Sequence, residues 1–306
     1  MADPIIRLKR SSTPGKIPLT SDLQLGELAI NTYDGKAYLK KDVSGVETVV
    51  NLGGGYPGQT YYVTKTGLDT NDGQNISAAF ATLKKALTVA VAGDTIQISS
   101  GTFTEIFPLT VPQGVTVRGN GIRSTFIQPT SGTERNDAFL LNGETTIEDL
   151  SLGNFYYNSS TDTGYGFKFA PNMVTTTRSP YIQRITVLNK GSTQTASDPY
   201  GFDTVDNYPT SKIAGRGVLI DASVVQATTL EPAMLFNEFT LIVPNATGVY
   251  MTNGVRSELL NGFIYFASKA IDAQSGTTGI GGVGKTRLKL TGASGSFVGG
   301  DVLTYK

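Results

Sequence analysis

A short pattern recurs through the middle of the chain, and it constrains the fold more than any other feature of the sequence. In each copy an apolar residue is followed by further apolar residues three and five positions later. The four copies are Ile147, Leu150 and Leu152; Ile182, Ile185 and Val187; Phe236, Phe239 and Leu241; and Leu260, Phe263 and Tyr265. A shorter alternating segment precedes each copy, at Phe139/Leu141, Phe167/Phe169, Val218/Ile220 and Val249/Met251. One repeat therefore holds two strands with a bend between them.

The intervals between the copies fit a solenoid of stacked coils. The first residues of successive copies are 35, 54 and 24 positions apart (182−147, 236−182 and 260−236). The shortest interval is close to one coil of a stacked architecture, and the longer intervals are expected to contain inserted loops or, in the middle one, a second coil. The polar stretch 198–216 is the largest of these insertions. A β-sandwich, which is also built from short alternating strands, is the alternative fold.

The segment from residue 60 to residue 105 is expected to open the solenoid. Residues 61–64 and 95–99 are predicted strands, because both segments are short and rich in β-branched or aromatic residues. Between them, residues 77–91 carry a helical period in which four apolar side chains form one stripe: Phe80, Leu83, Leu87 and Ala90. A helix at this place would cover the open end of the solenoid and its apolar interior.

This order of elements resembles the entry to the parallel β-helix of the pectate-lyase-like superfamily. The residues that carry the resemblance are Tyr61 to Val63, Gly67, Asp69, Asn71 to Gly73, Phe80, Thr82, Leu83, Ala86, Ala92 to Ile96, Ile98, Gly101 to Phe103 and Glu105. The resemblance implies an all-β fold, a right-handed single-stranded parallel β-helix with one capping α-helix. It is specific to the fold and implies no particular activity.

Two missing residue types exclude whole classes of chemistry. The 306 residues include no Cys and no His, so disulfides, zinc–thiolate sites, thiol catalysis and the commonest general base are absent. Lys and Arg together number 25, as do Asp and Glu, so no basic excess indicates nucleic-acid binding. No apolar run reaches the length of a membrane span, and we therefore expect no membrane insertion.

Residues 25–41 near the N-terminus are predicted to form a β-hairpin. Apolar and polar residues alternate along 28–32, with Leu28 and Ile30 on the apolar side, and alternate again along 36–39. Asp34-Gly35 between the two arms is expected to form the tight turn. A generic Asp-Gly hairpin of an unrelated β protein is the alternative interpretation.

The hairpin and its upstream segments 7–10 and 20–23 resemble the N-terminal attachment segment of bacteriophage tail-fibre, tailspike and receptor-binding proteins. The resemblance covers roughly residues 5–52, and its core is the run GELAINT at 26–32 followed by DGK at 34–36. The attachment residues that it assigns are Leu25, Gly26, Glu27, Leu28, Ile30, Asp34, Gly35 and Tyr38.

This resemblance implies a structural component of a phage virion, a tail-fibre or tailspike protein that is anchored by its N-terminus, attaches to the host and is assembled in the host cytoplasm. The resemblance also implies a homotrimer. A module of about fifty residues has too little core to stand alone, and association of three copies would bury its apolar residues. Expected partners are other phage tail, baseplate or neck proteins and host surface polysaccharide. The alternatives are a baseplate or neck/collar component without host contact and a tailspike enzyme that depolymerises polysaccharide.

Composition divides the chain into four parts. The attachment module is expected at 1–52, a Gly/Pro linker at 53–59 and the β-helix at 60–275. Residues 276–306 are Gly-rich at first and then strand-like. This last part is expected to continue into a further domain or a neighbouring subunit.

Two motifs have the letters of a binding site without its context. Gly279 to Thr286 satisfies the phosphate-loop pattern, but an alternating segment follows it in place of the required helix. Asp69 to Gly73 resembles the start of a calcium loop, but Gly stands where the third oxygen ligand belongs. We therefore predict no cofactor and no metal, and interpret the two segments as a linker and an Asx-turn connector.

Carboxylates and tyrosines are the remaining candidates for chemistry. The acidic residues considered for glycoside cleavage are Glu148, Asp149, Asp203, Asp206, Asp221 and Glu238. Asp149 and Glu238 share a position in the repeat, but the coil of Arg184 separates them, so we predict no catalytic residue and no enzyme activity. Tyrosines that could stack on a sugar are Tyr156, Tyr157, Tyr200 and Tyr208, although tyrosines also fill the interiors and interfaces of such folds.

Overall fold

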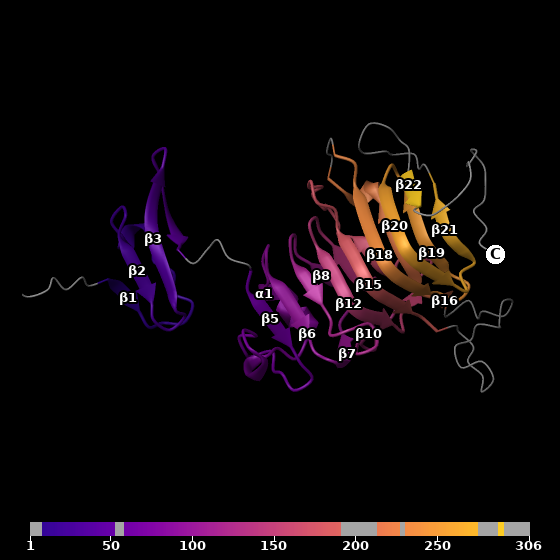
Figure 1. Cartoon of the computed structure of the whole chain (residues 1–306), viewed down its shortest axis with the longest axis horizontal. Helices are drawn as coiled ribbons and strands as arrows, with labels where there is room; N and C mark the ends of the chain where they lie inside the picture. Colours follow the sequence, from indigo (N-terminus) through magenta and orange to yellow (C-terminus); the bar gives the residue numbers. More distant parts are fainter. Residues whose placement is uncertain (1–7, 53–57, 191–212, 227–229, 275–286, 291–306) are drawn as a thin grey trace, which may run out of the picture. The chain divides into compact units, whose positions relative to one another are not determined.

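The structure is a computed structural model that describes residues 8–52, 58–190, 213–226, 230–274 and 287–290 (Figure 1). It contains two units, one ending at Pro57 and one beginning at Gly58. Each unit has its own sheets and its own buried apolar cluster. No helix in the described segments has the length and apolar character needed to cross a membrane.

The N-terminal unit is a four-stranded sheet with the order β1-β2-β3-β4. Its strands are β1 (Lys9–Ser11), β2 (Leu28–Asn31), β3 (Lys36–Val43) and β4 (Val46–Asn51), and a 3-10 turn covers Thr20–Asp22. β2 and β3 form the predicted antiparallel hairpin, with Leu28 opposite Leu39. The predicted two-residue turn is wrong, because Asn31 pairs with Lys36 and the connection has four residues, 32–35.

The Asn31 side chain explains this longer connection. Its Oδ1 accepts hydrogen bonds from the backbone N–H groups of Tyr33 and Asp34, at 3.0 and 3.1 Å. An Asx-type turn therefore begins at Asn31 and leaves only Gly35, with φ of +65°, to complete the reversal. The buried face of the hairpin also differs from the prediction, since Ala29 and Asn31 are buried whereas Leu28 and Ile30 are half-buried.

The larger unit is a right-handed parallel β-helix, as predicted, and the β-sandwich alternative is wrong. Its first sheet contains β5 (Thr60–Val63), β6 (Thr95–Ile98), β9 (Thr116–Arg118), β12 (Thr146–Gly153), β15 (Tyr181–Leu188), β18 (Ala233–Ile242), β20 (Arg256–Tyr265) and β22 (Arg287–Leu290), together with β7 (Gly101–Glu105) and β10 (Thr125–Pro129). All neighbours in this sheet are parallel and belong to successive coils (Figure 1). β15 pairs directly with β18, so the interval of 54 residues is one coil with an inserted loop.

A second parallel sheet closes each coil from the other side. It contains β8 (Leu109–Val111), β11 (Phe139–Leu141), β14 (Tyr165–Phe169), β17 (Arg216–Asp221), β19 (Thr247–Thr252) and β21 (Lys269–Ala273). These strands include the four short alternating segments of the repeat, as predicted. A separate antiparallel pair joins β13 (Tyr156–Tyr157) to β16 (Ile213–Ala214).

The capping helix is shorter than predicted. α1 covers Leu83–Val89, and the residues before it form a 3-10 turn at Ile76–Ala78. Thr82 ends the extended segment and caps α1, because its hydroxyl accepts from the Lys85 N–H at 3.0 Å. The helix packs against β8, the end strand of the second sheet, and buries Leu83, Ala86 and Leu87.

Each long strand of the first sheet bends at one residue that has a left-handed backbone. The φ values of Asp149, Arg184, Glu238 and Asn261 are +58°, +48°, +51° and +50°. These residues occupy equivalent positions in β12, β15, β18 and β20, because the pairing keeps one register on both sides of the bend. The bend adds one outward position to the strand alternation, which explains why inward residues recur at intervals of three and then two.

The bend also corrects the fourth copy of the repeat. Asn261 stands at the bend of β20, so Leu259, Gly262 and Ile264 take the inward positions opposite Phe236, Phe239 and Leu241. The predicted inward residues Leu260, Phe263 and Tyr265 therefore face outward. A Cβ at Gly262 would lie 2.1 Å from the Phe239 ring, so the neighbouring phenylalanine fills the space that an inward side chain would need.

Candidate functional site

The outer face of the first sheet carries one polar residue per coil in a continuous ladder. Tyr62 is paired with Gln97, Gln97 with Arg118, and Arg118 with Glu148. The ladder continues through Gln183 to Asn237. Neighbouring parallel strands lie about 4.8 Å apart, so these side chains stand in a row at that spacing. The register of the coils therefore gathers residues that lie far apart in the sequence.

Two arginines and two carboxylates form a closed network in the middle of this ladder. Glu148, only 4% exposed, accepts from Arg118 Nε at 2.5 Å, Gln183 Nε2 at 2.7 Å and Arg184 Nη2 at 2.7 Å. Asp149 accepts from Arg184 Nε at 2.6 Å and from Arg184 Nη2 at 3.0 Å. The hydrogen bond to Asp149 raises the pKa of the Arg184 guanidinium. Four formal charges thus cancel in one cluster.

The bend positions bring the last two of these residues together. Asp149 and Arg184 stand at the bends of neighbouring strands, and Glu238 stands at the bend of the strand on the following coil, next to Arg184. An ordinary strand alternation would direct a side chain at this position inward, whereas the bend directs it outward beside its outward neighbour. The prediction that Asp149 and Glu238 share one position with Arg184 between them therefore agrees with the pairing register.

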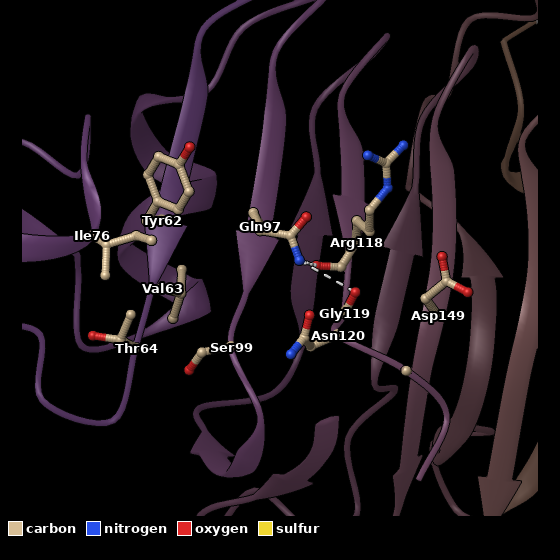
Figure 2. Close-up of a pocket in the computed structure, with 11 residues that line it drawn as sticks. Tyr62, Val63, Thr64, Ile76, Gln97, Ser99, Arg118, Gly119, Asn120 and Asp149 are labelled. Carbon is tan, nitrogen blue, oxygen red and sulfur yellow. Dashed lines mark hydrogen bonds between the residues drawn. The ribbon is translucent and has the colours of Figure 1, made fainter. Parts of the chain in front are cut away.

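A pocket of about 460 Å³ lies beside this network on the first coils (Figure 2). Its polar lining comes from the outer face of the sheet and the adjoining turns: Tyr62, Thr64, Gln97, Ser99, Arg118, Asn120 and Asp149. The exposed Ile76, from the 3-10 turn before α1, adds an apolar wall near Tyr62. Gly119 also lines the pocket, and a Cβ there would lie 2.2 Å from the Asp149 carbonyl oxygen, so this close approach of two coils requires glycine.

The pocket's amide side chains are held in place by neighbouring backbone and hydroxyl groups. Gln97 Nε2 donates to the Gly119 carbonyl oxygen at 3.3 Å, as drawn in Figure 2. Asn120 Nδ2 donates to Ser100 Oγ at 3.0 Å. Each amide nitrogen is therefore fixed, and among the described residues no group donates to either amide oxygen, so both oxygens are left as acceptors.

The residues assigned to virion attachment lie together in the N-terminal unit, where several of them hold the hairpin in shape. Glu27 accepts from the Gln24 N–H at 2.7 Å and from Lys9 Nζ at 3.0 Å, and Asp34 accepts from the Gly15 N–H at 2.8 Å. Tyr38 is buried, and Leu25 is exposed. Gly26 and Gly35 both have positive φ values.

Sequence reasoning missed Asn31, which organises this unit. Its Nδ2 donates to the carbonyl oxygens of Thr13 and Lys16, at 2.9 and 3.1 Å, and to Asp34 Oδ2 at 2.6 Å. An asparagine followed by Asp-Gly three residues later was the available signal, because Asn side chains start such turns.

Of the four tyrosines considered as glycan contacts, the structure describes Tyr156 and Tyr157, and neither is fully exposed. Tyr157 is 9% exposed, its hydroxyl donates to Asp162 at 2.9 Å, and the Arg216 guanidinium covers its ring at 3.7 Å. This geometry does not favour Tyr157 as a sugar contact. Tyr156 is half-buried, and Tyr200 and Tyr208 lie outside the described residues.

The other candidate motifs have structural roles or lie outside the described segments. Asp69, from the calcium-like motif, accepts from the N–H groups of Ala81 and Thr82 at 2.9 Å each and so secures the start of α1. Asp221 accepts from the Ser223 N–H and from Asn253 Nδ2. The phosphate-loop pattern at 279–286 and the acidic residues Asp203 and Asp206 are outside the described residues. Within those residues, no cluster of acidic side chains suits a metal ion.

Comparison with known proteins gives no assignment of function. Residues 65–168 match a family described as a protein of unknown function (DUF1565). No curated protein matches the sequence. Among solved structures, a rhamnogalacturonan lyase is similar at 15% identity with a TM-score of 0.42, over 76% of this chain and 62% of that one. The pectate lyase Pel9A is similar at 11% identity with a TM-score of 0.25, over 75% of this chain and 82% of that one.

These two structures correct one prediction from the sequence. Both are lyases, so they stand against the prediction that the chain is not an enzyme, and that prediction is withdrawn. The chain spans less than two thirds of the length of the rhamnogalacturonan lyase, and likeness at this level assigns no activity to it. The absence of His and Cys still excludes the triad chemistries, which need those side chains.

Proposed function

We propose that this chain is a tail-fibre or tailspike component of a bacteriophage virion that attaches to a host surface polysaccharide. In this proposal the N-terminal unit joins three copies and fastens them to tail, baseplate or neck proteins. The β-helix then presents its polar outer face to the host glycan. The resemblance of the GELAINT and DGK segments, at 26–32 and 34–36, supports the first step.

The imbalance between buried and exposed apolar residues in the N-terminal unit carries this proposal. Among the residues that the structure describes, its buried apolar cluster consists of Leu23, Ala29 and Tyr38, with the half-buried Val49 packed against them. Eight large apolar side chains of the same unit are exposed: Leu8, Ile17, Leu19, Leu25, Tyr33, Val43, Val46 and Leu52. Burial of exposed apolar surface stabilises an assembly by about 25 cal/mol for each Å² that is removed from water. Association with other copies and with a virion partner would supply that burial.

The oligomeric state of the full-length protein tests the first part. Light scattering at micromolar concentration is expected to give the mass of a trimer. Leu25→Asp places a charge in the exposed apolar set and is expected to shift the mass toward the monomer, whereas Leu68→Asp is the matched control. Leu68 is also exposed but lies on a loop of the β-helix. A monomeric wild-type protein would refute the assembly.

Location and cell binding test the second part. Immunogold labelling of phage particles made with a tagged copy of the chain is expected to mark the tail fibres or the tail tip. Purified full-length protein is expected to bind host cells and to lose binding after their surface polysaccharide is stripped. Label confined to the neck or baseplate core, together with no cell binding, would replace host attachment by an internal structural role.

A polysaccharide-depolymerising role is a second candidate, favoured by one observation. Asp149 and Glu238 occupy the same bend position two strands apart, with Arg184 at the bend of the strand between them. Two strand spacings amount to roughly 9–10 Å, close to the separation of about 6.5–9.5 Å between the carboxyl groups of inverting glycosidases. Release of reducing ends from host polysaccharide by the wild type, abolished in Asp149→Asn and Glu238→Gln, would establish this role. If the polysaccharide stays intact after prolonged incubation, the depolymerising role is refuted and attachment is the remaining proposal.

A further inference from the structure

We propose that the pocket between Tyr62 and Asp149 binds an uncharged saccharide unit, so that the host glycan is recognised on the first coils of the β-helix. This inference rests on the proposed attachment function and adds the place and the charge class of the ligand. The pocket volume of about 460 Å³ and its open position on a sheet face suit one or two sugar rings of a longer chain.

One wall of the pocket is apolar and open to solvent. Ile76 is 70% exposed, and Tyr62 stands beside it at the start of the polar ladder (Figure 2). A sugar ring presents C–H groups on its faces and hydroxyls around its edge. An aromatic ring next to an aliphatic side chain provides the surface that such a face covers.

The opposite side of the pocket offers hydrogen-bonding groups with capacity to spare. The Gln97 and Asn120 amide nitrogens are engaged, so their oxygens remain as acceptors for sugar hydroxyls. Arg118 uses only its Nε for Glu148 among the described residues, and its two Nη groups remain as donors. Donors and acceptors thus line the same pocket as an apolar wall, which is the combination that binds the edge and the face of a polyhydroxyl ring.

The charge balance selects against acidic sugars. The lining contains one arginine and one aspartate, and no lysine. Arg118 pairs with Glu148, and the Asp149 carboxylate on the pocket wall pairs with Arg184, so the charges of this cluster balance. A uronate or phosphate would therefore find no surplus positive charge to offset the loss of its hydration. An uncharged ring has no such desolvation cost.

A glycan array probed with the full-length protein tests this inference. The probes are uncharged bacterial surface oligosaccharides together with uronate-, sialate- and phosphate-bearing ones. Gln97→Ala removes one hydrogen bond and is expected to weaken binding about fivefold. Tyr62→Ala removes the aromatic wall and is expected to weaken it roughly tenfold. Gln113→Ala is the matched control, because Gln113 is exposed on a turn outside the pocket.

The outcomes separate this inference from the function on which it rests. The inference is supported if the wild type binds uncharged glycans and this binding is weaker in both pocket variants but not in the control. Retention only on acidic glycans, or retention unchanged in both variants, overturns it and leaves attachment intact if the protein still binds cells. Absence of binding to every glycan overturns the inference, and absence of cell binding as well overturns attachment.

Discussion

Removal of one stacked phenylalanine from the interior should show that the coils are held together by inward columns. Phe167 is fully buried in β14, its ring stacks on Phe139 with centroids 5.7 Å apart, and it meets Phe236 edge-on at 6.0 Å. Truncation of a buried phenylalanine to alanine costs about 3–5 kcal/mol. The loss of two aromatic pairs places Phe167→Ala in the upper half of that range. Phe263→Ala removes a ring that faces outward, 57% exposed, and should cost less than about 1 kcal/mol.

Urea unfolding followed by circular dichroism measures both variants against the wild type at one protein concentration. Fixing the concentration matters because association with other copies would itself shift the transition. Stacked coils can unfold in more than one step, so the comparison uses the first transition that involves the β-helix. If Phe263→Ala lowers the free energy of unfolding as much as Phe167→Ala does, Phe263 does not face outward. That result would refute the register of β20 and the stacking of inward residues from coil to coil.

Three further predictions concern polar groups. Burial raises the pKa of Glu105 above its ordinary 4.5, so its stabilising contribution is complete below pH 4.5 and is lost as the pH rises through the raised value. Glu105→Gln should therefore flatten the fall in Tm as the pH rises above 4.5, measured by calorimetry. Arg184→Ala should lower the free energy of unfolding by about 1–2 kcal/mol in urea titrations, because Glu148 and Asp149 lose charged donors while Arg184 itself is partly exposed. Asn31→Ala should destabilise the N-terminal unit by roughly 2 kcal/mol, seen as faster amide hydrogen exchange in β1 and β2 with β-helix amides unchanged.

The sequence revealed the coils because inward residues must be apolar on every coil. Ile147, Ile182 and Phe236 stack in one column, and their spacing to the next inward residues records the bend between them. The fourth copy was misplaced by one residue because Gly262 carries no side chain to mark the inward position. The outward-facing aromatic residues Phe263 and Tyr265 then matched the spacing of the apolar repeat. A hydrophobic repeat thus fixes a register only where the inward side chain is present.

The polar pocket was beyond sequence reasoning for a different reason. Tyr62, Gln97 and Arg118 are separated by 35 and 21 positions (97−62 and 118−97), and only the pairing of β5, β6 and β9 sets them side by side. Outward positions of a parallel sheet accept almost any polar residue, so no local pattern distinguishes a binding residue from a solvated one. Asp149 and Glu238 were placed correctly because the bend ties them to the inward columns on either side.

The same bend separates what the core requires from what the surface can vary. Asp149, Arg184, Glu238 and Asn261 share one backbone conformation although their side chains are acidic, basic, acidic and neutral. A left-handed residue costs about 1 kcal/mol or more, except that Asn and Asp adopt this conformation more readily. Packing of the stacked inward side chains offsets that cost. The side chains at the bend positions can therefore be acidic, basic or neutral in any order along the sheet. The order of charges on this face can therefore change from coil to coil without repacking of the interior, and the net charge beside the pocket is set by the bend positions and by the outward polar residues next to them.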